Sequence, residues 1–221
     1  MLAKDRYPVT YYVADIYIRD ITSFRTYVSE TESRLERVED MARACDAIVA
    51  VSGDYFLFHY GGLAIRNGVL YREKLHSAQE VCVLFRDGTV ETFETGHVDL
   101  DYIYSRDPWQ AWSFGPHLIE DGQPAVEFNT SVFDRNPRCV LGYYEPGHYC
   151  MVVVDGRQRG YSVGLDMAEL AQLMCDLGCT QAFNLDGGMT SMMAYGGELY
   201  SRPCGGGRSN CDILYIGEPE N

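Results

Sequence analysis

The segment RCVLGYYEPGHYCMVVVDGR, residues 138–157, decides the fold class of this chain. Two apolar runs flank Glu145-Pro146-Gly147-His148, and Pro and Gly at such a place are typical of a tight turn between antiparallel strands. Asn67-Gly68, Asp87-Gly88 and Asp121-Gly122 give the same signal between other strand-like runs. The sequence therefore predicts a mostly antiparallel twisted sheet built from hairpins.

Two further segments have the periodicity of amphipathic helices. The first, SETESRLERVEDMARACDA, opens with the capping-box pattern of Ser29 and Glu32. The second, DMAELAQLMCDLG, begins at Asp166, has Glu169 three residues later and ends at a glycine. Two main helices packed on an antiparallel sheet make an α+β fold. Because the chain has no linker or low-complexity segment, we expect residues 1–221 to form a single domain.

The charge of the chain limits its partners. Its 221 residues include 18 basic and 32 acidic side chains, which give a net charge of −14, and no basic run offsets it. Such a surface repels nucleic acid and anionic membranes, so we expect no nucleic-acid partner. No apolar stretch reaches the roughly 18 residues of a membrane span, so we expect no membrane insertion either. An anionic substrate would need a local arginine pocket. The sequence indicates no oligomeric state.

Eight cysteines raise the question of zinc sites and disulfides. No two of them have the C-x-x-C spacing of a zinc site. Most lie in apolar runs such as VCVLF and HYCMVVV, where a free cysteine packs as a small core residue. We expect most of them to be packing residues, and we take Cys204–Cys211 as the best candidate for a disulfide.

Each predicted helix leads into an apolar strand that ends in aspartate and glycine. The first strand, AIVAVSGDYF, ends at Gly53-Asp54, and the second, AFNLDGGMTS, ends at Asp186-Gly187-Gly188. Such ends bring a carboxylate to the edge of a sheet and let a ligand approach the backbone. Asn184 and Asp186 share strand parity and would face one side. A plain strand-ending turn explains the same pattern and stays open as the alternative.

Three aspartates and three arginines are the candidates for chemistry. They share positions at the ends of apolar strands or beside turns that contain Gly or Pro: Asp54, Asp155, Asp186, Arg138, Arg157 and Arg208. Because a guanidinium can bind two phosphate oxygens at once, we interpret the arginines as an anion pocket. Surface ion pairs would explain each arginine separately. The five histidines are scattered without metal-ligand spacing and are weaker candidates.

Seven motifs, in this order, resemble the phosphodiester glycosidase family: VSGDYF, GGLAIRNGVLYR, WSFGPHLIEDG, NPRCVLGY, VVVDGR, AFNLDGGMTS and GRSNCDILYI. The resemblance covers about residues 10–217. It implies hydrolysis of a sugar-1-phosphodiester, of the GlcNAc-1-phosphate type, at the anomeric carbon, with release of sugar and a phosphomonoester. Bacterial members are often labelled exopolysaccharide biosynthesis proteins. The resemblance therefore also implies a glycan or sugar-phosphate substrate in cell-surface or exopolysaccharide metabolism.

With this chemistry, Asp186 is the leading candidate for base or nucleophile, and Asp155 and Asp54 are its rivals. The arginines would hold the phosphate, which departs as a stable anion, and so replace much of the general acid of ordinary glycosidases. Substrate would also contact the polar and glycine residues of the second strand end: Asn184, Gly187, Gly188 and Ser191.

Two alternatives stay open. The three aspartates would bind Ca²⁺ or Mg²⁺, which prefer oxygen ligands, if the enzyme were a metal-dependent phosphodiester hydrolase. Otherwise we expect no cofactor. The chain would bind polysaccharide without turnover if it had kept the fold alone. The resemblance favours an extracellular or cell-surface location, with an N-terminal signal or anchor ahead of this sequence, and a cytoplasmic location is the alternative.

Overall fold

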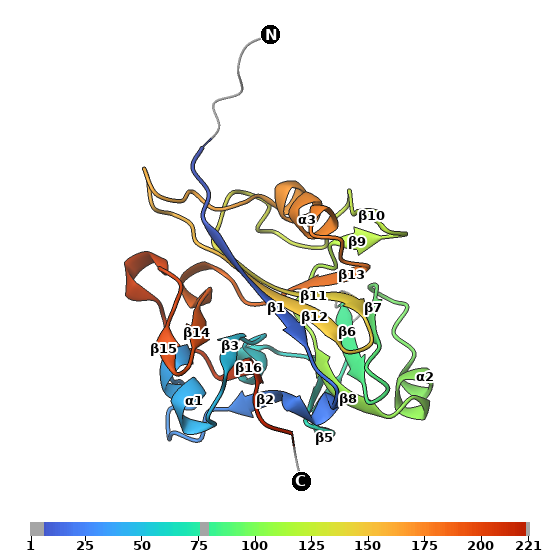
Figure 1. Cartoon of the computed structure of the whole chain (residues 1–221). Coiled ribbons are helices and arrows are strands. Elements are labelled where there is room, and N and C mark those ends of the chain that lie inside the picture. Colours follow the sequence, from blue (N-terminus) through green and yellow to red (C-terminus); the bar gives the residue numbers. More distant parts are fainter. Residues whose placement is uncertain (1–6, 76–79, 220–221) are drawn as a thin grey trace.

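The computed structural model describes residues 7–75 and 80–219, and Figure 1 shows their arrangement in several antiparallel sheets with short helices against them. The α+β fold class is therefore confirmed. The first sheet has the order β1-β12-β11-β13, formed by Tyr11–Tyr17, His148–Val154, Arg138–Glu145 and Gln181–Asn184. As predicted, residues 138–157 give a hairpin of two strands, and its turn contains Gly147 at φ +88°.

Two five-stranded sheets and one short hairpin complete the strands of the described residues. The second sheet has the order β15-β14-β3-β16-β2, formed by Glu198–Leu199, Met193–Tyr195, Val49–Ser52, Asp212–Ile216 and Phe24–Val28. The third has the order β5-β4-β8-β6-β7, formed by Val69–Lys74, Gly62–Arg66, Pro108–Trp112, Val81–Phe85 and Val90–Phe93. The hairpin joins β9 (Ile119–Glu120) to β10 (Gln123–Pro124). The three Asn-Gly and Asp-Gly turns connect β4 to β5, β6 to β7 and β9 to β10, as predicted.

The first sheet lies between two apolar layers. On one face, Val153 packs in a core cluster that also contains Trp112 of β8 and Leu214 of β16. On the other face, Val152 packs against α3 (Met167–Asp176) through residues such as Leu170. Successive strand residues point to opposite faces, so β12 supplies both layers and is buried from Tyr149 to Val154.

The helix predicted at Asp166 is α3, and its capping box is present. The Asp166 side chain accepts a hydrogen bond from the Glu169 backbone, and the Glu169 side chain accepts one from the Asp166 backbone. Gly178 follows at φ +88°, in the left-handed region that a helix-ending glycine adopts. A further short helix that the sequence analysis did not predict, α2, spans Leu100–Ser105.

The first predicted helix is much shorter than its sequence pattern. Only Val38–Ala44 are helical, as α1, and they pack on the second sheet. The capping-box prediction at Ser29 and Glu32 is wrong, because Arg34 takes a φ of +56° and Glu36 pairs with Asn210 as an isolated β-bridge. This distant pairing replaces the first turns of the expected helix.

All eight cysteines are free thiols, so the predicted Cys204–Cys211 disulfide is absent. The Cys211 side chain turns into a small cluster with Phe56 and Ala64, and its Sγ lies 3.5 Å from Oδ1 of Asp212. Cys204 begins a separate 3₁₀ turn, η4 (Cys204–Gly206).

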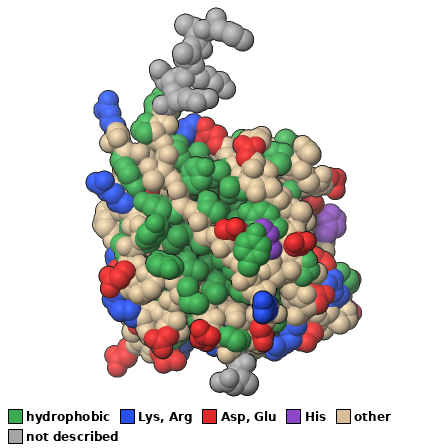
Figure 2. Space-filling model, viewed as in Figure 1, with side chains coloured by type: hydrophobic (Ala, Val, Ile, Leu, Met, Phe, Trp, Pro, Cys, Tyr) green, Lys and Arg blue, Asp and Glu red, His purple; other side chains and the backbone are tan. Residues whose placement is uncertain are grey.

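An exposed apolar area covers the free side of β1, at the edge of the first sheet (Figure 2). A groove of about 470 Å³ lies there, and its lining includes Val13, Tyr17, Ile48, Tyr195 and Tyr200. No helix of the described residues combines the length and apolar character needed to cross a membrane.

Candidate active site

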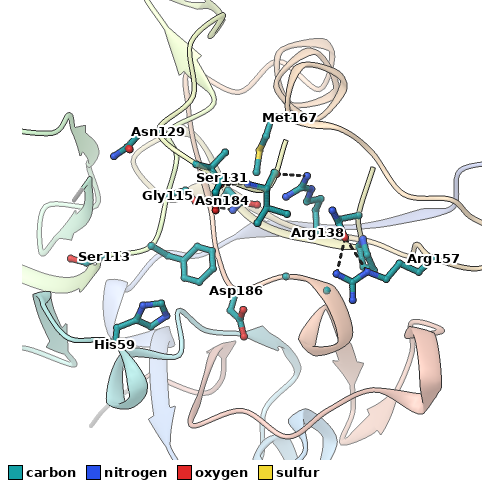
Figure 3. A pocket seen from close by; sticks show the side chains of 17 residues that line it. His59, Ser113, Gly115, Asn129, Ser131, Arg138, Arg157, Met167, Asn184 and Asp186 are labelled. Carbon is teal, nitrogen blue, oxygen red and sulfur yellow. Dashed lines mark hydrogen bonds between the residues drawn. The ribbon is translucent and has the colours of Figure 1, made fainter. Parts of the chain in front are cut away.

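A cavity of about 460 Å³ opens where β11 begins and where β12 and β13 end (Figure 3). Its wall includes polar side chains from distant parts of the chain: His59, Asn129, Arg138, Arg157, Asn184 and Asp186. Four of these are residues that the sequence analysis selected, and Gly187 and Gly188 line the same cavity. We call this cavity the Asp186 pocket.

Asp186 follows β13 and is 9% exposed. Burial raises the pKa of its carboxyl group above the ordinary value, while the Thr190 hydroxyl and Arg208 partly oppose this shift. The Thr190 hydroxyl donates a 2.7 Å hydrogen bond to Oδ2. Thr190 closes a 3₁₀ turn, η3 (Gly188–Thr190), so the DGGMT sequence bends back on its own carboxylate.

The two glycines after Asp186 fit this bend for different reasons. A Cβ at Gly187 would lie 2.9 Å from the carbonyl oxygen of Pro137, so only glycine lets the two backbones meet. Gly188 takes a φ of +69° and donates a 3.0 Å hydrogen bond to the same carbonyl. The Asp186 backbone in turn donates to the carbonyl of Gly53, which joins the two strand ends.

Arg138 is 3% exposed and is held by backbone carbonyls. Its Nε donates to Leu165, and its Nη2 donates to Val132 and Asp134, at 2.7–3.1 Å. Burial lowers the pKa of this guanidinium to about 10. Within the described part of the chain, no carboxylate lies within 4.0 Å of it.

Arg157 approaches the same pocket from the turn after β12. Its Nε and Nη2 both donate to Oδ1 of Asn136, at 2.9 and 2.8 Å. Its Nη2 lies 3.4 Å from the point where a Cβ at Gly188 would stand. Arg157, like Arg138, has no ion-pair partner among the described residues, so the pocket wall carries two guanidinium groups without an ion pair, beside the carboxyl group of Asp186. Such a wall favours an anion with several oxygens.

Of the two polar residues Asn184 and Ser191, only Asn184 lines the pocket. Asn184 donates from Nδ2 to the carbonyl of Gly115 at 2.8 Å, and its Oδ1 is buried without a partner at the pocket wall. The Ser191 Oγ is also buried without a partner, but Ser191 does not line the pocket. Asn184 is therefore placed to accept a hydrogen bond from a ligand, whereas Ser191 lies behind Gly187.

Asp54 belongs to a closed ion cluster instead of the pocket wall. Nη2 of Arg66 lies 2.6 Å from Asp54 and 3.1 Å from Asp212, and all three side chains are at most 1% exposed. The second Asp54 oxygen accepts a 3.0 Å hydrogen bond from the Ser113 backbone. Burial and the nearby charge of Asp54 raise the pKa of Asp212 to about 7, although Arg66 partly opposes this shift. We call this group the Arg66 cluster.

Asp155 and Arg208 also lie off the wall. Oδ2 of Asp155 accepts hydrogen bonds from the Tyr161 hydroxyl at 2.9 Å and from the Arg202 backbone at 3.1 Å. Asp155 is fully buried, and so the turn that aims Arg157 at the pocket turns this aspartate inward. Arg208 lies over the Tyr55 ring, with its Nη2 3.7 Å from Oδ2 of Asp186.

The sequence analysis missed one wall of the pocket. His59 and Phe114 meet edge to face, with ring centroids 5.5 Å apart, and Figure 3 shows His59 on the same side of the cavity as Asp186. His59 follows a 3₁₀ turn, η2 (Phe56–Phe58), and Phe114 follows β8. No local spacing links the two residues, and only the VSGDYF and WSFGPHL motifs pointed to their neighbourhoods.

The three aspartates do not meet around one point. Among the residues that the structure describes, no three His, Cys, Asp or Glu side chains are grouped as metal ligands. Asp54 and Asp155 already have internal partners, so they are poorly suited to share a cation with Asp186. That the protein needs no cofactor stays a prediction.

The family model for phosphodiester glycosidases matches residues 46–216, a range that contains every selected residue of the pocket. The chain belongs to the phosphodiester glycosidase family. The chain is 31% identical over 195 residues to the SPbeta prophage-derived uncharacterized protein YomE of Bacillus subtilis (strain 168). The match covers 84% of this chain but only 30% of YomE.

Two solved structures share the fold of this chain. The zebrafish N-acetylglucosamine-1-phosphodiester α-N-acetylglucosaminidase catalytic domain, auto-inhibited by its pro-peptide, superposes with a TM-score of 0.74 at 20% identity, over 99% of this chain and 85% of that one. A hypothetical protein from Synechocystis gives a TM-score of 0.60 at 14% identity, over 96% and 64% of the two chains. At these identities the likeness shows the fold alone.

Proposed function

We propose that this protein hydrolyses a sugar-1-phosphodiester in the Asp186 pocket and releases the sugar and a phosphomonoester. One observation carries the proposal: a buried carboxyl group and two arginines without carboxylate partners line the same cavity. A carboxyl group is needed to react or to activate water at the anomeric carbon, and cations are needed to hold the departing phosphate.

The two arginines differ in how they would bind phosphate. Arg138 is fixed by three carbonyls, so its direction is set before substrate arrives. Arg157 is exposed and held by one amide oxygen, so its side chain can change conformation to fit the second substituent of the phosphodiester. A phosphate monoester is a good leaving group once its charge is held, so no second carboxylic acid is required.

Asp186 would act as the nucleophile or the general base. Both roles require the ionised carboxylate, and its raised pKa makes it more basic than an exposed aspartate. The Thr190 hydroxyl orients Oδ2 and donates to the ionised form. Asp54 and Asp155 are not given this role, because neither lines the pocket.

The opposite wall would hold the sugar. The faces of His59 and Phe114 offer apolar contact to a pyranose ring, and Oδ1 of Asn184 offers an acceptor to a hydroxyl or amide hydrogen. GlcNAc is the first sugar to test, because the zebrafish enzyme with this fold is named for it. We extend the proposal to a glycan or sugar-phosphate substrate of cell-surface or exopolysaccharide metabolism, in an extracellular or cell-surface location.

The test is release of free sugar from UDP-GlcNAc and from alkyl diesters of GlcNAc-1-phosphate, each with and without EDTA. We expect GlcNAc and the matching phosphomonoester in equal amounts, with the same rate in EDTA. Release that EDTA abolishes would instead support metal-dependent hydrolysis. Absence of release from a panel of sugar diesters, combined with glycan binding, would contradict the proposal and favour a binding protein.

A further inference from the structure

Two cysteines outside the Asp186 pocket lie in contact beneath α3. Cys150 is in β12 and fully buried, and Cys179 precedes β13 and is 5% exposed. Their sulfur atoms are 3.6 Å apart, and both residues belong to the apolar cluster between α3 and the first sheet. The two cysteines are 29 positions apart in the sequence, yet they meet in the folded chain.

Gly142, which has no side chain, leaves room for the two sulfur atoms. A Cβ at Gly142 would lie 2.5 Å from the Cys150 sulfur and 2.8 Å from the Cys179 sulfur. Gly142 lies in β11, where it is opposite Cys150 on one side and Ala182 on the other. Both thiols therefore occupy the space over one glycine, together with Cε of Met174, which lies 2.7 Å from the same point.

We propose that Cys150 and Cys179 are a redox site, oxidised to a disulfide by small-molecule disulfides such as glutathione disulfide. The sulfur atoms need to come about 1.5 Å closer to reach a bond length of about 2.05 Å, which rotation of the side chains can supply. The proposal rests on the thiol geometry and does not depend on the proposed hydrolysis.

The exchange balances in two steps. The thiolate of Cys179, the more exposed residue, attacks glutathione disulfide, and a mixed disulfide forms as one glutathione thiolate leaves. The Cys150 thiolate then attacks the Cys179 sulfur and expels the second glutathione thiolate. The two cysteines lose two electrons, glutathione disulfide gains them, and the two cysteine protons go to the two glutathione thiolates.

The bond would fasten the start of β13 to β12. It would close a loop that contains α3 and the Arg157 turn, and a closed loop reduces the freedom of the unfolded chain. For a loop and a protein of these sizes, we expect the melting temperature to rise by about 5–15 °C.

The experiment incubates the folded protein with glutathione disulfide, unfolds it, alkylates the remaining thiols and maps the peptides. We expect six of the eight thiols to be alkylated, a mass loss of about 2 Da from two hydrogens, and a peptide that links Cys150 to Cys179. Dithiothreitol is expected to reverse both the link and the rise in melting temperature.

Matched variants separate this site from other cysteines. Cys82→Ala removes a fully buried thiol that belongs to a different core cluster and is expected to leave the link intact. Cys179→Ala, with Cys150→Ala as a second choice if the first does not fold, is expected to abolish the link and the shift. The proposal is overturned if Cys150 and Cys179 are both alkylated after oxidation, if Cys179 keeps a stable glutathione adduct, or if the link joins other cysteines instead.

Discussion

Two sites in this molecule combine aspartate and arginine at the end of an apolar strand, and they differ in how the charges are compensated. In the Arg66 cluster, one guanidinium lies between Asp54 and Asp212, and none of the three is exposed beyond 1%. In the Asp186 pocket, Arg138 and Arg157 have no carboxylate within 4.0 Å among the described residues.

The difference separates a structural site from a binding site. A buried charge is tolerated only with a partner of opposite charge or with hydrogen bonds that replace water. In the Arg66 cluster the guanidinium and both carboxyl groups have partners of opposite charge within the chain, so the cluster has no need of a ligand. In the pocket, backbone carbonyls satisfy donors of the buried Arg138 and Arg157 is exposed, but neither guanidinium has an ion-pair partner, so an anionic ligand would supply one.

The largest expected effect is the loss of hydrolysis in Asp186→Asn. Asparagine keeps the acceptor for the Thr190 hydroxyl but can neither attack nor take a proton, so kcat/KM should fall about 10³-fold or more. Sugar release gives the rate, and thermal melting confirms the fold. Asp176→Asn, an exposed change at the end of α3, is the matched control and should keep the wild-type rate. Near-normal turnover by Asp186→Asn would remove Asp186 from the mechanism.

The Arg66 cluster should respond in stability. Arg66→Met leaves two buried carboxyl groups without their cation, which should lower the free energy of unfolding by about 3–5 kcal/mol. Urea denaturation measures this change. The control is Arg106→Met, because Arg106 also pairs with two acids, Asp87 and Glu91, but at the surface. We expect a change below about 1 kcal/mol there. Equal changes in both variants would contradict the assigned difference in burial.

Arg138→Lys should weaken substrate use without unfolding the protein. Lysine keeps a positive charge but loses the guanidinium that three backbone carbonyls orient, so we expect kcat/KM to fall about 10–100-fold. Steady-state kinetics on a GlcNAc-1-phosphodiester measure the change. Arg135→Lys, three residues away and ion-paired with Glu169, should stay within about twofold of wild type. An unchanged KM and kcat in Arg138→Lys would show that phosphate is bound elsewhere.

The smallest expected effect concerns the pH dependence of activity. Asp186 must be ionised to act, so kcat/KM should fall as the pH drops through its raised pKa. Arg208→Met removes a cation that lowers this pKa, so the acid limb should move to higher pH by less than about one unit. A large rise in KM in this variant would instead restore Arg208 to the phosphate-binding role that its sequence position predicted.

Local signals predicted the hairpins and α3, because the residues that determine them are neighbours in sequence. The Asn67-Gly68 turn has both residues at positive φ, and the Asp166 cap lies three residues from Glu169. The first helix was overestimated for the opposite reason, since Glu36 pairs with Asn210, far along the chain. No local pattern contains that contact.

The sequence predicted only part of the site. The residues that it misassigned or did not select have partners that are far away along the chain. The DGG motif identified Asp186, but Asp54 also lies beside a glycine at the end of an apolar strand. Only the ion pairs of Arg66 with Asp54 and Asp212 show that Asp54 is part of a buried cluster and not of the pocket. His59 and Phe114 form a wall by tertiary packing between separate loops. Uncompensated charge depends on every neighbour in space, so the sequence could nominate arginines without showing which are paired.

The most direct measurement is calorimetric titration of Asp186→Asn, in which turnover is stopped, with a GlcNAc-1-phosphodiester and with the methyl glycoside of GlcNAc. The account predicts that the diester binds at least about tenfold more tightly than the glycoside, and that adding Arg138→Met removes this preference. Equal affinity for the two ligands, or a preference that survives Arg138→Met, would contradict the claim that the unpaired arginines of the Asp186 pocket bind phosphate.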